Sequence, residues 1–437
     1  MVRTTAENPV TATPPLATGV AWDAEAPGHT KFSVDRYTDQ SWLDRELEQM
    51  WPQVWQIACS ADHVANPGDW YEHRFGATSI LIVHGDGGQL RAFQNVCRHR
   101  GNLLCQGTGQ GLAELRCQFH RWAWSLEGEL KEVPSRRAFG TLRNEDLPLL
   151  PASVASWGPL VFVNTDPDAA PLQEWLEGIP ADIEWARMEE FHCGITTTTP
   201  VSCNWKVVSE GFSESYHVQG LHPEMTGSVD DLHAAQYFWD RHAVSYQLYG
   251  ISSPRYPGLT DQEIWDSFNV TQGARAGLPV DQTRPMPDLA ADETAFDALS
   301  RSIRDHNHNR GVDLDGFDDD QIMRIRQYNL FPNASVLITA DSINVLVSRP
   351  TTIVDKAELF TMHLQRHPST ATDFKQPTDV ANSLDSERLG LVFNQDIRAM
   401  GLVQRGMTQP GFTETIVSSE ERRIINTHRV LATYLDD

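Results

Sequence analysis

Two cysteine–histidine pairs constrain this chain more than any other feature. The first is CRHRG at 97–101 and the second is CQFH at 117–120, with seventeen residues between the first histidine and the second cysteine. Two loops that meet would present two thiolates and two imidazoles to metal. A structural zinc site is one interpretation, but zinc fingers place both cysteines before both histidines. The observed order suits a two-iron cluster in which the thiolates hold one iron and the imidazoles the other.

The pairs lie in a region of short β-rich runs, from Gln56 to about Thr165, separated by Gly, Asp and Pro clusters. This pattern predicts a small, mostly β domain, with a hairpin at 84–88. Apolar residues at helical spacing from Trp42 to Trp51 predict a short helix before it. Glycines near the pairs indicate tight loops, and Trp122 and Trp124 are predicted to shield the metal ligands from water.

The rest of the chain predicts a second, mixed domain. Helices are expected near 204–218, 294–308 and 384–406, and we expect strands in the runs TTTTPVSC, AVSYQLYG, ASVLITA, INVLVSR and KAELFTMHL. The segment 252–325 is rich in Asp, Arg, Asn, Gly and Pro, and predicts a loop-rich lid or entrance.

A second constellation contains His217 and His222. Five residues on a regular helix give about 140° of rotation, which points two side chains apart. Both histidines can face one metal only if the helix ends or loosens between them, as Gly220 and Pro223 would allow. Glu214, three residues before His217, is expected on the same helix face.

Asp396 is the best candidate for a third ligand. It falls on an apolar helical stripe, where a buried carboxylate is costly unless it is paired or binds metal. The stripe consists of Leu389, Val392, Ala399, Met400 and Val403. Two histidines and one carboxylate form the facial triad of mononuclear Fe(II) sites. The alternative is a salt bridge from Asp396 to Arg398, Arg405 or another cation.

These motifs resemble a known family. CRHRG followed by CQFHRWAW resembles the Rieske [2Fe–2S] motif, and NWK…EGFSESYHVQGLHP resembles the catalytic signature of Rieske non-haem iron oxygenase α subunits, the aromatic-ring-hydroxylating dioxygenase family. QDIRAMGLVQRG resembles their late segment, which carries the carboxylate ligand. The resemblance implies an α+β fold: a mostly β Rieske domain after a short helix, then a helix-grip catalytic domain with an antiparallel sheet.

We therefore expect four segments along the chain. They are a flexible lead-in at 1–37, a Rieske domain with its leading helix at 38–165, a connection at 166–195 and a mononuclear iron domain at 196–437.

The resemblance also implies residue roles. The expected ligands of the [2Fe–2S] cluster are Cys97, His99, Cys117 and His120. The expected ligands of a mononuclear Fe(II) are His217, His222 and Asp396. Glu214 takes the place of the acid that bridges the two centres, where many members have Asp, and would reach His120 of a neighbouring subunit. Members that resemble quaternary-amine oxygenases also have Glu there. Gln395 stands where an acid is common.

The implied activity is that of an oxygenase component, which activates O2 and hydroxylates an apolar, aromatic small molecule. Monohydroxylation or oxidative N- or O-demethylation of a non-ring or quaternary-amine substrate is the alternative. Electrons would come from NAD(P)H through a separate reductase, with or without a ferredoxin, since no Gly-rich nucleotide fingerprint follows a strand. A homotrimer is expected, with β subunits optional. A Rieske electron carrier or a ligand-binding helix-grip module is the non-catalytic alternative.

Composition narrows the function classes further. With 35 Lys and Arg against 59 Asp and Glu, the net charge is −24, which disfavours binding to nucleic acid or an anionic membrane. No run approaches 18 apolar residues, so no membrane span is expected. Six cysteines in 437 residues are too few for a disulfide scaffold. Without a secretory signal in the sequence, a cytoplasmic location is expected.

Overall fold

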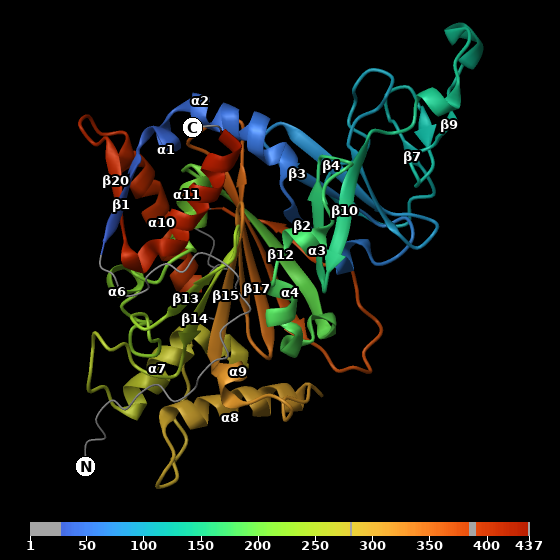
Figure 1. Cartoon of the computed structure of the whole chain (residues 1–437). Coiled ribbons are helices and arrows are strands. Elements are labelled where there is room, and N and C mark those ends of the chain that lie inside the picture. The colour runs from blue at the N-terminus through green and yellow to red at the C-terminus, as the bar shows by residue number, and fades with distance from the viewer. Residues whose placement is uncertain (1–27, 280–281, 384–389, 436–437) are drawn as a thin grey trace.

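The computed structural model describes residues 28–279, 282–383 and 390–435. It contains two β-rich parts that lie side by side (Figure 1). The N-terminal part is built on a seven-stranded sheet and carries a three-stranded sheet at its far end, whereas the C-terminal part is built on an eight-stranded sheet with helices. Among the described residues, no helix has both the length and the apolar character needed to cross a membrane.

The seven-stranded sheet is antiparallel and has the order β2-β11-β10-β5-β4-β3-β6. Its strands are β2 (Gln56–Ser60), β3 (Trp70–Phe75), β4 (Thr78–His84), β5 (Leu90–Gln94), β6 (Thr108–Gly109), β10 (Pro151–Trp157) and β11 (Leu160–Asn164). The small sheet consists of β7 (Leu115–Arg116), β8 (Ala123–Trp124) and β9 (Leu130–Glu132). The predicted hairpin at 84–88 is confirmed, because β4 and β5 pair with His84 opposite Leu90. The small sheet holds the second cysteine loop between β7 and β8.

The helix predicted around Trp42 is confirmed. It is built from α1 (Asp35–Thr38), α2 (Gln40–Arg45) and the short turns η1 (Glu46–Met50) and η2 (Trp51–Gln53). Its buried Glu46 accepts hydrogen bonds from Lys206 Nζ (2.5 Å) and Trp205 Nε1 (2.7 Å) of the second domain. Burying a charge is tolerated when it is paired, so this ion pair fixes the leading helix against the catalytic part.

The eight-stranded sheet has the order β13-β14-β15-β16-β17-β18-β12-β19, antiparallel except for the β12–β19 pair. Its strands are β12 (Phe191–Val201), β13 (Ala235–Phe238), β14 (Ala243–Leu248), β15 (Arg324–Leu330), β16 (Ala334–Ile338), β17 (Ser342–Pro350), β18 (Ala357–Arg366) and β19 (Thr378–Ala381). All five predicted strand runs are present. β15 was not predicted, because its sequence RIRQYNL is polar. Its Arg324 is paired with Asp320 (2.6 Å), which makes its burial tolerable.

Three helices pack against the sheet, and a fourth lies between the two histidines of the second pair. They are α5 (Trp205–Gly211), α6 (Val218–Leu221), α10 (Gly390–Met407) and α11 (Arg422–Leu435). The short two-stranded sheet of β1 (His29–Ser33) and β20 (Glu414–Ser418) lies beside α10 and α11 (Figure 1). The predicted helix at 384–406 is present from Gly390 onward, and residues 384–389 lie outside the described residues, as do 1–27 of the predicted lead-in.

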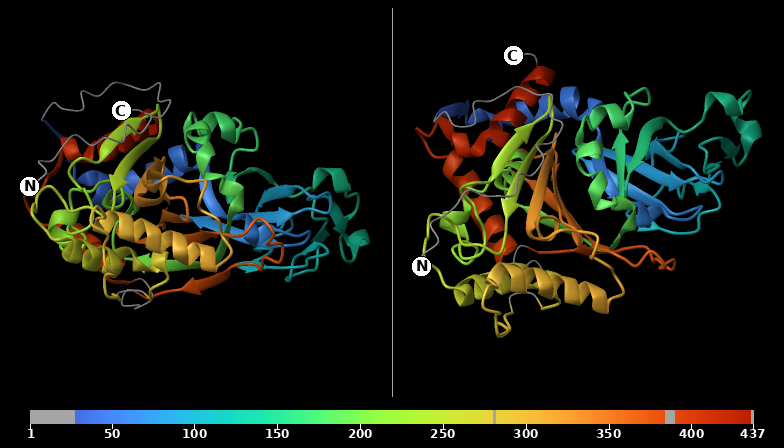
Figure 2. Two further views of the ribbon diagram at one scale, coloured as in Figure 1. Left: turned by 90° about the horizontal axis from the view of Figure 1, so that it is seen from below. Right: turned by 60° about the horizontal axis from the view of Figure 1, so that its bottom comes forward.

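The segment 252–325 contains more helix than expected, and the helix predicted within it near 294–308 is confirmed. This segment forms α7 (Asp261–Gln272), η8 (Gly273–Ala276), α8 (Ala295–Asn309) and α9 (Asp319–Met323). α7 and α8 pack around the buried residues Trp265, Phe268, Leu299 and Ile303, and lie across one end of the sheet (Figure 2). Apolar residues at helical spacing therefore outweighed the many loop-forming residues between them.

The predicted connection at 166–195 contains short helical turns and the start of β12. These turns are α3 (Leu172–Trp175), α4 (Ile179–Asp182), η6 (Glu184–Ala186) and η7 (Met188–Glu190).

Two histidine–aspartate contacts join the two parts across their boundary. His63 of η3 (Ala61–Val64) contacts Asp379 of β19 (3.1 Å), and His192 of β12 contacts Asp62 of η3 (2.8 Å). Each side therefore supplies one imidazole and one carboxylate, which joins the two parts by directional bonds.

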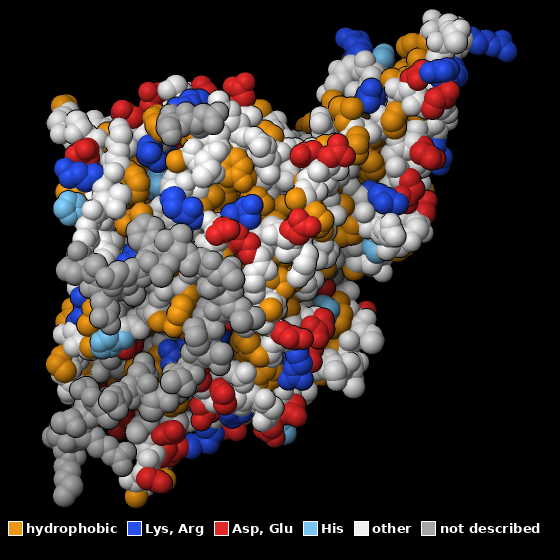
Figure 3. All heavy atoms as spheres, in the orientation of Figure 1, with side chains coloured by type: hydrophobic (Ala, Val, Ile, Leu, Met, Phe, Trp, Pro, Cys, Tyr) orange, Lys and Arg blue, Asp and Glu red, His pale blue; other side chains and the backbone are white. Residues whose placement is uncertain are grey.

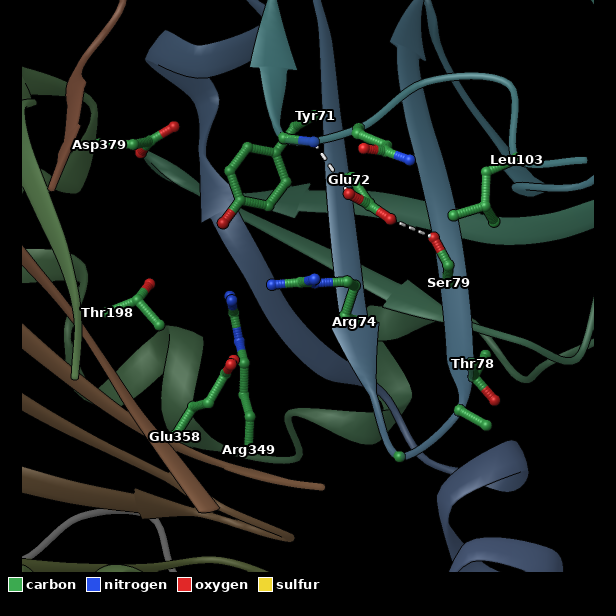
Figure 4. A pocket seen from close by; sticks show the side chains of 14 residues that line it. Tyr71, Glu72, Arg74, Thr78, Ser79, Leu103, Thr198, Arg349, Glu358 and Asp379 are labelled. Atoms are coloured by element: carbon green, nitrogen blue, oxygen red, sulfur yellow. Dashed lines mark hydrogen bonds between the residues drawn. The ribbon is translucent and has the colours of Figure 1, made fainter. Parts of the chain in front are cut away.

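A cleft of about 470 Å³ lies beside this boundary. In Figure 4, Arg74 of β3 and Arg349 of β17 extend into it from opposite parts. Arg349 Nη2 also donates to the carbonyl of Ala58 (2.8 Å) in β2. The residues that line the cleft include none of the predicted metal ligands.

Candidate metal centres

The two cysteine loops have the same backbone hydrogen bonds. In each, the cysteine carbonyl accepts from the N–H four residues later, and the cysteine N–H donates to the carbonyl five residues later. For Cys97 the partners are Gly101 (3.0 Å) and Asn102 (2.8 Å), and for Cys117 they are Arg121 (3.0 Å) and Trp122 (2.8 Å). The chain thus builds one turn twice, and each turn carries a cysteine followed by a histidine.

The four predicted cluster ligands form a thiol pair and an imidazole pair on the two loops. Cys97 and Cys117 are buried, and burial together with the neighbouring Cys117 thiol raises the pKa of Cys97. The rings of His99 and His120 lie 4.7 Å apart between centroids and are partly exposed at the end of the domain. Trp122 stacks on His99 at 5.0 Å with an interplanar angle of 4°, as the predicted shielding requires.

This donor set fits a two-iron cluster. His99 Nδ1 is buried and has no hydrogen-bond partner among the described residues. This nitrogen is therefore available to bind a metal. Buried polar atoms are normally paired, and a pair of soft thiol ligands beside a pair of imidazoles on two matching loops favours an iron–sulfur group.

The second histidine pair lies on either side of a single helical turn. α5 ends at Gly211, well before His217, so the prediction of one helix over 204–218 is wrong. A Cβ on Gly211 would lie 2.6 Å from Met400 Cε, so α10 and α5 approach each other closely at this glycine. His217 precedes α6 and His222 follows it, which lets both rings face one point, with centroids 5.2 Å apart. As expected, the helix ends between the two histidines, at Leu221. It is also separate from α5, which ends before His217.

Asp396 completes the group from α10. Its Oδ1 lies 2.8 Å from His222 Nε2 and 3.8 Å from His217 Nε2, and one donor atom from each of the three residues lies within 4.8 Å of the others. The carboxylate is only 4% exposed. The apolar stripe predicted for α10 is partly wrong, because Val403 is exposed; Leu389 lies outside the described residues.

The other ring nitrogen of each histidine is already engaged. His217 Nδ1 contacts Glu214 Oε1 (2.5 Å), and His222 Nδ1 contacts Gln395 Oε1 (2.7 Å). Both oxygens are acceptors, so each Nδ1 is the donor, and in the neutral rings each Nε2 bears a lone pair. The lone pairs of the two Nε2 atoms and the carboxylate of Asp396 then face one another without a hydrogen between them. A cation between these atoms removes that repulsion, and the donor set suits Fe(II).

Glu214 holds its histidine by two bonds, since the His217 backbone N–H also donates to Glu214 Oε2 (2.9 Å). Burial lowers the pKa of His217, but the hydrogen bond and charge of Glu214 outweigh this and raise the pKa overall. Glu214 is therefore placed through a local turn and not on one face of a continuous helix.

Gln395 is the residue whose role the sequence did not reveal. It appeared only as a departure from a common acid, whereas its amide oxygen orients His222. Its position next to Asp396 was the signal, because a ligand's neighbour on the same helix turn can reach the adjacent ligand.

Comparison with known proteins agrees with this architecture. The family model described as "Ring hydroxylating alpha subunit (catalytic domain)" matches residues 182–437, and the Rieske [2Fe-2S] domain model matches residues 54–152. The fold and the two centres thus define a Rieske non-haem iron oxygenase, a class that binds a [2Fe–2S] cluster and a mononuclear iron. The chain belongs to the family of ring-hydroxylating oxygenase α subunits.

Curated relatives include proteins with different substrates. The carnitine monooxygenase oxygenase subunit of Escherichia coli (strain K12) is 29% identical over 233 residues, which is 53% of this chain and 62% of the relative. The glycine betaine monooxygenase oxygenase subunit of Pseudomonas aeruginosa (strain UCBPP-PA14) is 29% identical over 47% of this chain and 49% of its own. Biphenyl 2,3-dioxygenase subunit alpha of Rhodococcus jostii (strain RHA1) is 30% identical over 41% of each. The chain therefore spans less than two thirds of the length of these relatives.

Solved structures share the fold over nearly the whole chain. A quaternary ammonium Rieske monooxygenase in complex with L-carnitine aligns with a TM-score of 0.66 at 17% identity, covering 92% of this chain and 95% of that one. Naphthalene 1,2-dioxygenase with indole bound aligns with a TM-score of 0.65 at 16% identity, covering 93% and 92%.

Proposed function

We propose that this chain is the oxygenase subunit of a multicomponent Rieske oxygenase. Residues 38–165 form its cluster-bearing unit and 196–437 its iron-bearing unit, joined by 166–195. In this proposal, the [2Fe–2S] ligands are Cys97, His99, Cys117 and His120, and the Fe(II) ligands are His217, His222 and Asp396. When bound, the two groups supply the one-electron chemistry and the O2 activation that lead to hydroxylation.

One observation carries the proposal. The carboxylate of Asp396 faces Nε2 of both His217 and His222, while both Nδ1 atoms are fixed by acceptors. An electron carrier or a simple ligand-binding module has no use for this second group of ligands, so the arrangement favours an enzyme.

For the substrate we infer a small quaternary amine, oxidised by monohydroxylation or demethylation. The net charge of −24 attracts a cation. Relatives that act on carnitine and glycine betaine support the same choice.

An aromatic substrate, which the sequence favoured, is the second candidate. Its support is the aromatic pair Phe212 and Phe393, whose centroids lie 6.0 Å apart close to the iron ligands, and the similarity to a biphenyl dioxygenase subunit.

We further propose a separate NAD(P)H-dependent reductase, with or without a ferredoxin, and a homotrimer. Figure 3 shows several Lys and Arg side chains at the far end of the projecting N-terminal domain. Arg100, Arg121 and Arg137 are exposed there, near the partly exposed rings of His99 and His120. Basic groups on a strongly acidic chain suit an acidic partner, including a second copy of this chain.

Metal analysis tests the class. About three iron atoms and two acid-labile sulfides per chain are expected for the oxygenase, whereas about two iron atoms would support a carrier and zinc a structural site. Product analysis tests the substrate. With a surrogate reductase, O2 uptake coupled to an oxidised product is expected for choline or glycine betaine and not for biphenyl. The reverse result would favour the aromatic candidate.

A further inference from the structure

Arg423 is buried at a costly position. Its side chain is 1% exposed, and it is the second residue of α11, where the helix dipole disfavours a cation. No carboxylate forms an ion pair with it in the described part of the chain, and its Nε has no hydrogen-bond partner there. Burial lowers the pKa of Arg423 to about 9, and the charge of Glu214 opposes this effect. A buried cation without a carboxylate partner does not stabilise the fold, so we looked for another role of Arg423 in its contacts.

The donors of Arg423 determine how two amides on β15 are oriented. Nη1 donates to Asn329 Oδ1 (2.5 Å) and to Gln327 Oε1 (3.2 Å). Because a guanidinium can only donate, both amide oxygens must face it, and both NH₂ groups must point away. The orientation of each amide therefore follows from the chemistry of its neighbour.

Those NH₂ groups hold the end of α5. Gln327 Nε2 and Asn329 Nδ2 donate to the Phe212 carbonyl (2.6 and 3.3 Å), and Asn329 Nδ2 also donates to Ser213 Oγ (3.0 Å). Phe212 is the residue at which α5 stops, and Ser213 directly follows it. The amides thus clamp the backbone where the chain leaves the helix.

The clamped segment leads directly to the iron ligands. Glu214 follows Ser213 and fixes His217 through both its ring and its backbone N–H. The Phe212 ring packs against Phe393 of α10, which lies three residues before Asp396. A shift of the Phe212 carbonyl would therefore move Glu214 and change the position of the loop that carries His217 relative to α10, which carries Asp396.

We propose that Arg423 is a positioning residue for the mononuclear iron site. It acts through Gln327 and Asn329, which hold the loop that carries Glu214 and His217. This inference rests on the proposed function, because it assigns Fe(II) to that site. Residues that orient metal ligands from outside the ligand set typically alter metal affinity by about 10–100-fold.

Two variants separate positioning from stability. Arg423→Met removes the donors that orient both amides. Asn329→Asp keeps the size and gives Arg423 a carboxylate partner, but removes the NH₂ donors to Phe212 and Ser213. The second variant gains an ion pair, so the protein remains folded even if Arg423→Met does not. Arg366→Met is the matched control, since Arg366 is equally buried but bonds to Glu190 and the carbonyls of Ala186 and Ala340.

The measurement is Fe(II) affinity of the metal-depleted full-length chain, titrated against a chelator, with urea unfolding of the same samples. About tenfold or more loss of affinity is expected in Arg423→Met and Asn329→Asp, with no loss of stability in Asn329→Asp and little loss of affinity in Arg366→Met. Affinity within twofold of the unaltered protein in Asn329→Asp, or equal loss in Arg366→Met, would overturn the inference. Failure of the unaltered chain to bind Fe(II) would instead overturn the proposed function, and the inference with it.

Discussion

Gly101 and Arg121 occupy the same position in the two cysteine loops, and both have a left-handed backbone, with φ of 77° and 63°. Glycine adopts this conformation freely, whereas a residue with a Cβ pays about 1 kcal/mol or more for it. The two halves of the cluster site are thus alike in hydrogen bonding but differ in backbone strain.

The first prediction follows from this difference. Gly101→Ala should destabilise the metal-free protein by about 1 kcal/mol, from backbone strain alone, because nothing lies within 4 Å of the added Cβ. Arg121→Gly should change the stability by less than about 0.5 kcal/mol, because relief of strain offsets the greater freedom of the unfolded chain. Anaerobic urea unfolding measures both, and equal losses would contradict this account.

Asp396→Ala should remove the mononuclear iron and leave the cluster. The anionic ligand is lost, so iron should fall from about three to about two atoms per chain with an unchanged visible spectrum. Asp341→Ala is the control, because Asp341 is equally buried but pairs with Arg275. Full iron content and activity in Asp396→Ala would exclude it as a ligand.

Gln395→Leu should weaken Fe(II) binding by about 10–100-fold, because the Nδ1–H of His222 loses its acceptor. Gln395→Glu keeps an acceptor at the same distance along the side chain and should restore most of the affinity. Chelator competition measures both. If the two variants bind iron equally well, the amide of Gln395 does not orient His222.

Glu214→Gln should retain both metal centres but reduce turnover by at least about tenfold. Gln keeps the size and one acceptor for His217, but loses the charge that the bridging role requires. Iron, sulfide and product are measured together. Glu210→Gln, four residues earlier in the chain and bonded to Tyr37 and His428, is the matched control. Normal product yield with Glu214→Gln would refute the bridge, and loss of iron without other change would indicate purely local support.

His242 should make stability depend on pH. Burial lowers its pKa to about 4, although its bond to the Trp175 carbonyl opposes the shift. The unfolded chain takes up a proton near pH 6.5, so the stability that the neutral ring contributes is complete above that pH. It is lost as the pH falls toward 4, up to about 3 kcal/mol. Urea unfolding from pH 7 to 4 should show a flatter profile for His242→Gln, and identical profiles would contradict the assignment.

The grouping of the candidate ligands could be predicted from sequence because their residue types and spacing carry the chemistry directly. The local backbone structure, such as the end of α5 and the strand β15, could not be predicted. Gly211 ends α5 where Met400 crosses it, and that contact joins residues far apart in the chain. β15 was missed for a similar reason: its polar residues are satisfied by Asp320 and Arg423, which periodicity cannot associate with a strand. Residues that act through a distant partner leave no local pattern.

Pairing of β1 with β20 has a consequence for biosynthesis. Lys31 and Glu414 are bonded across 383 positions of sequence, so the first described strand leaves the ribosome long before its partner. At about 5–20 residues per second, that strand waits on the order of tens of seconds. The cysteine loops have all their residues within that interval, whereas Asp396 emerges near its end. Cluster assembly can therefore begin on the nascent chain well before all the residues of the mononuclear site have been made.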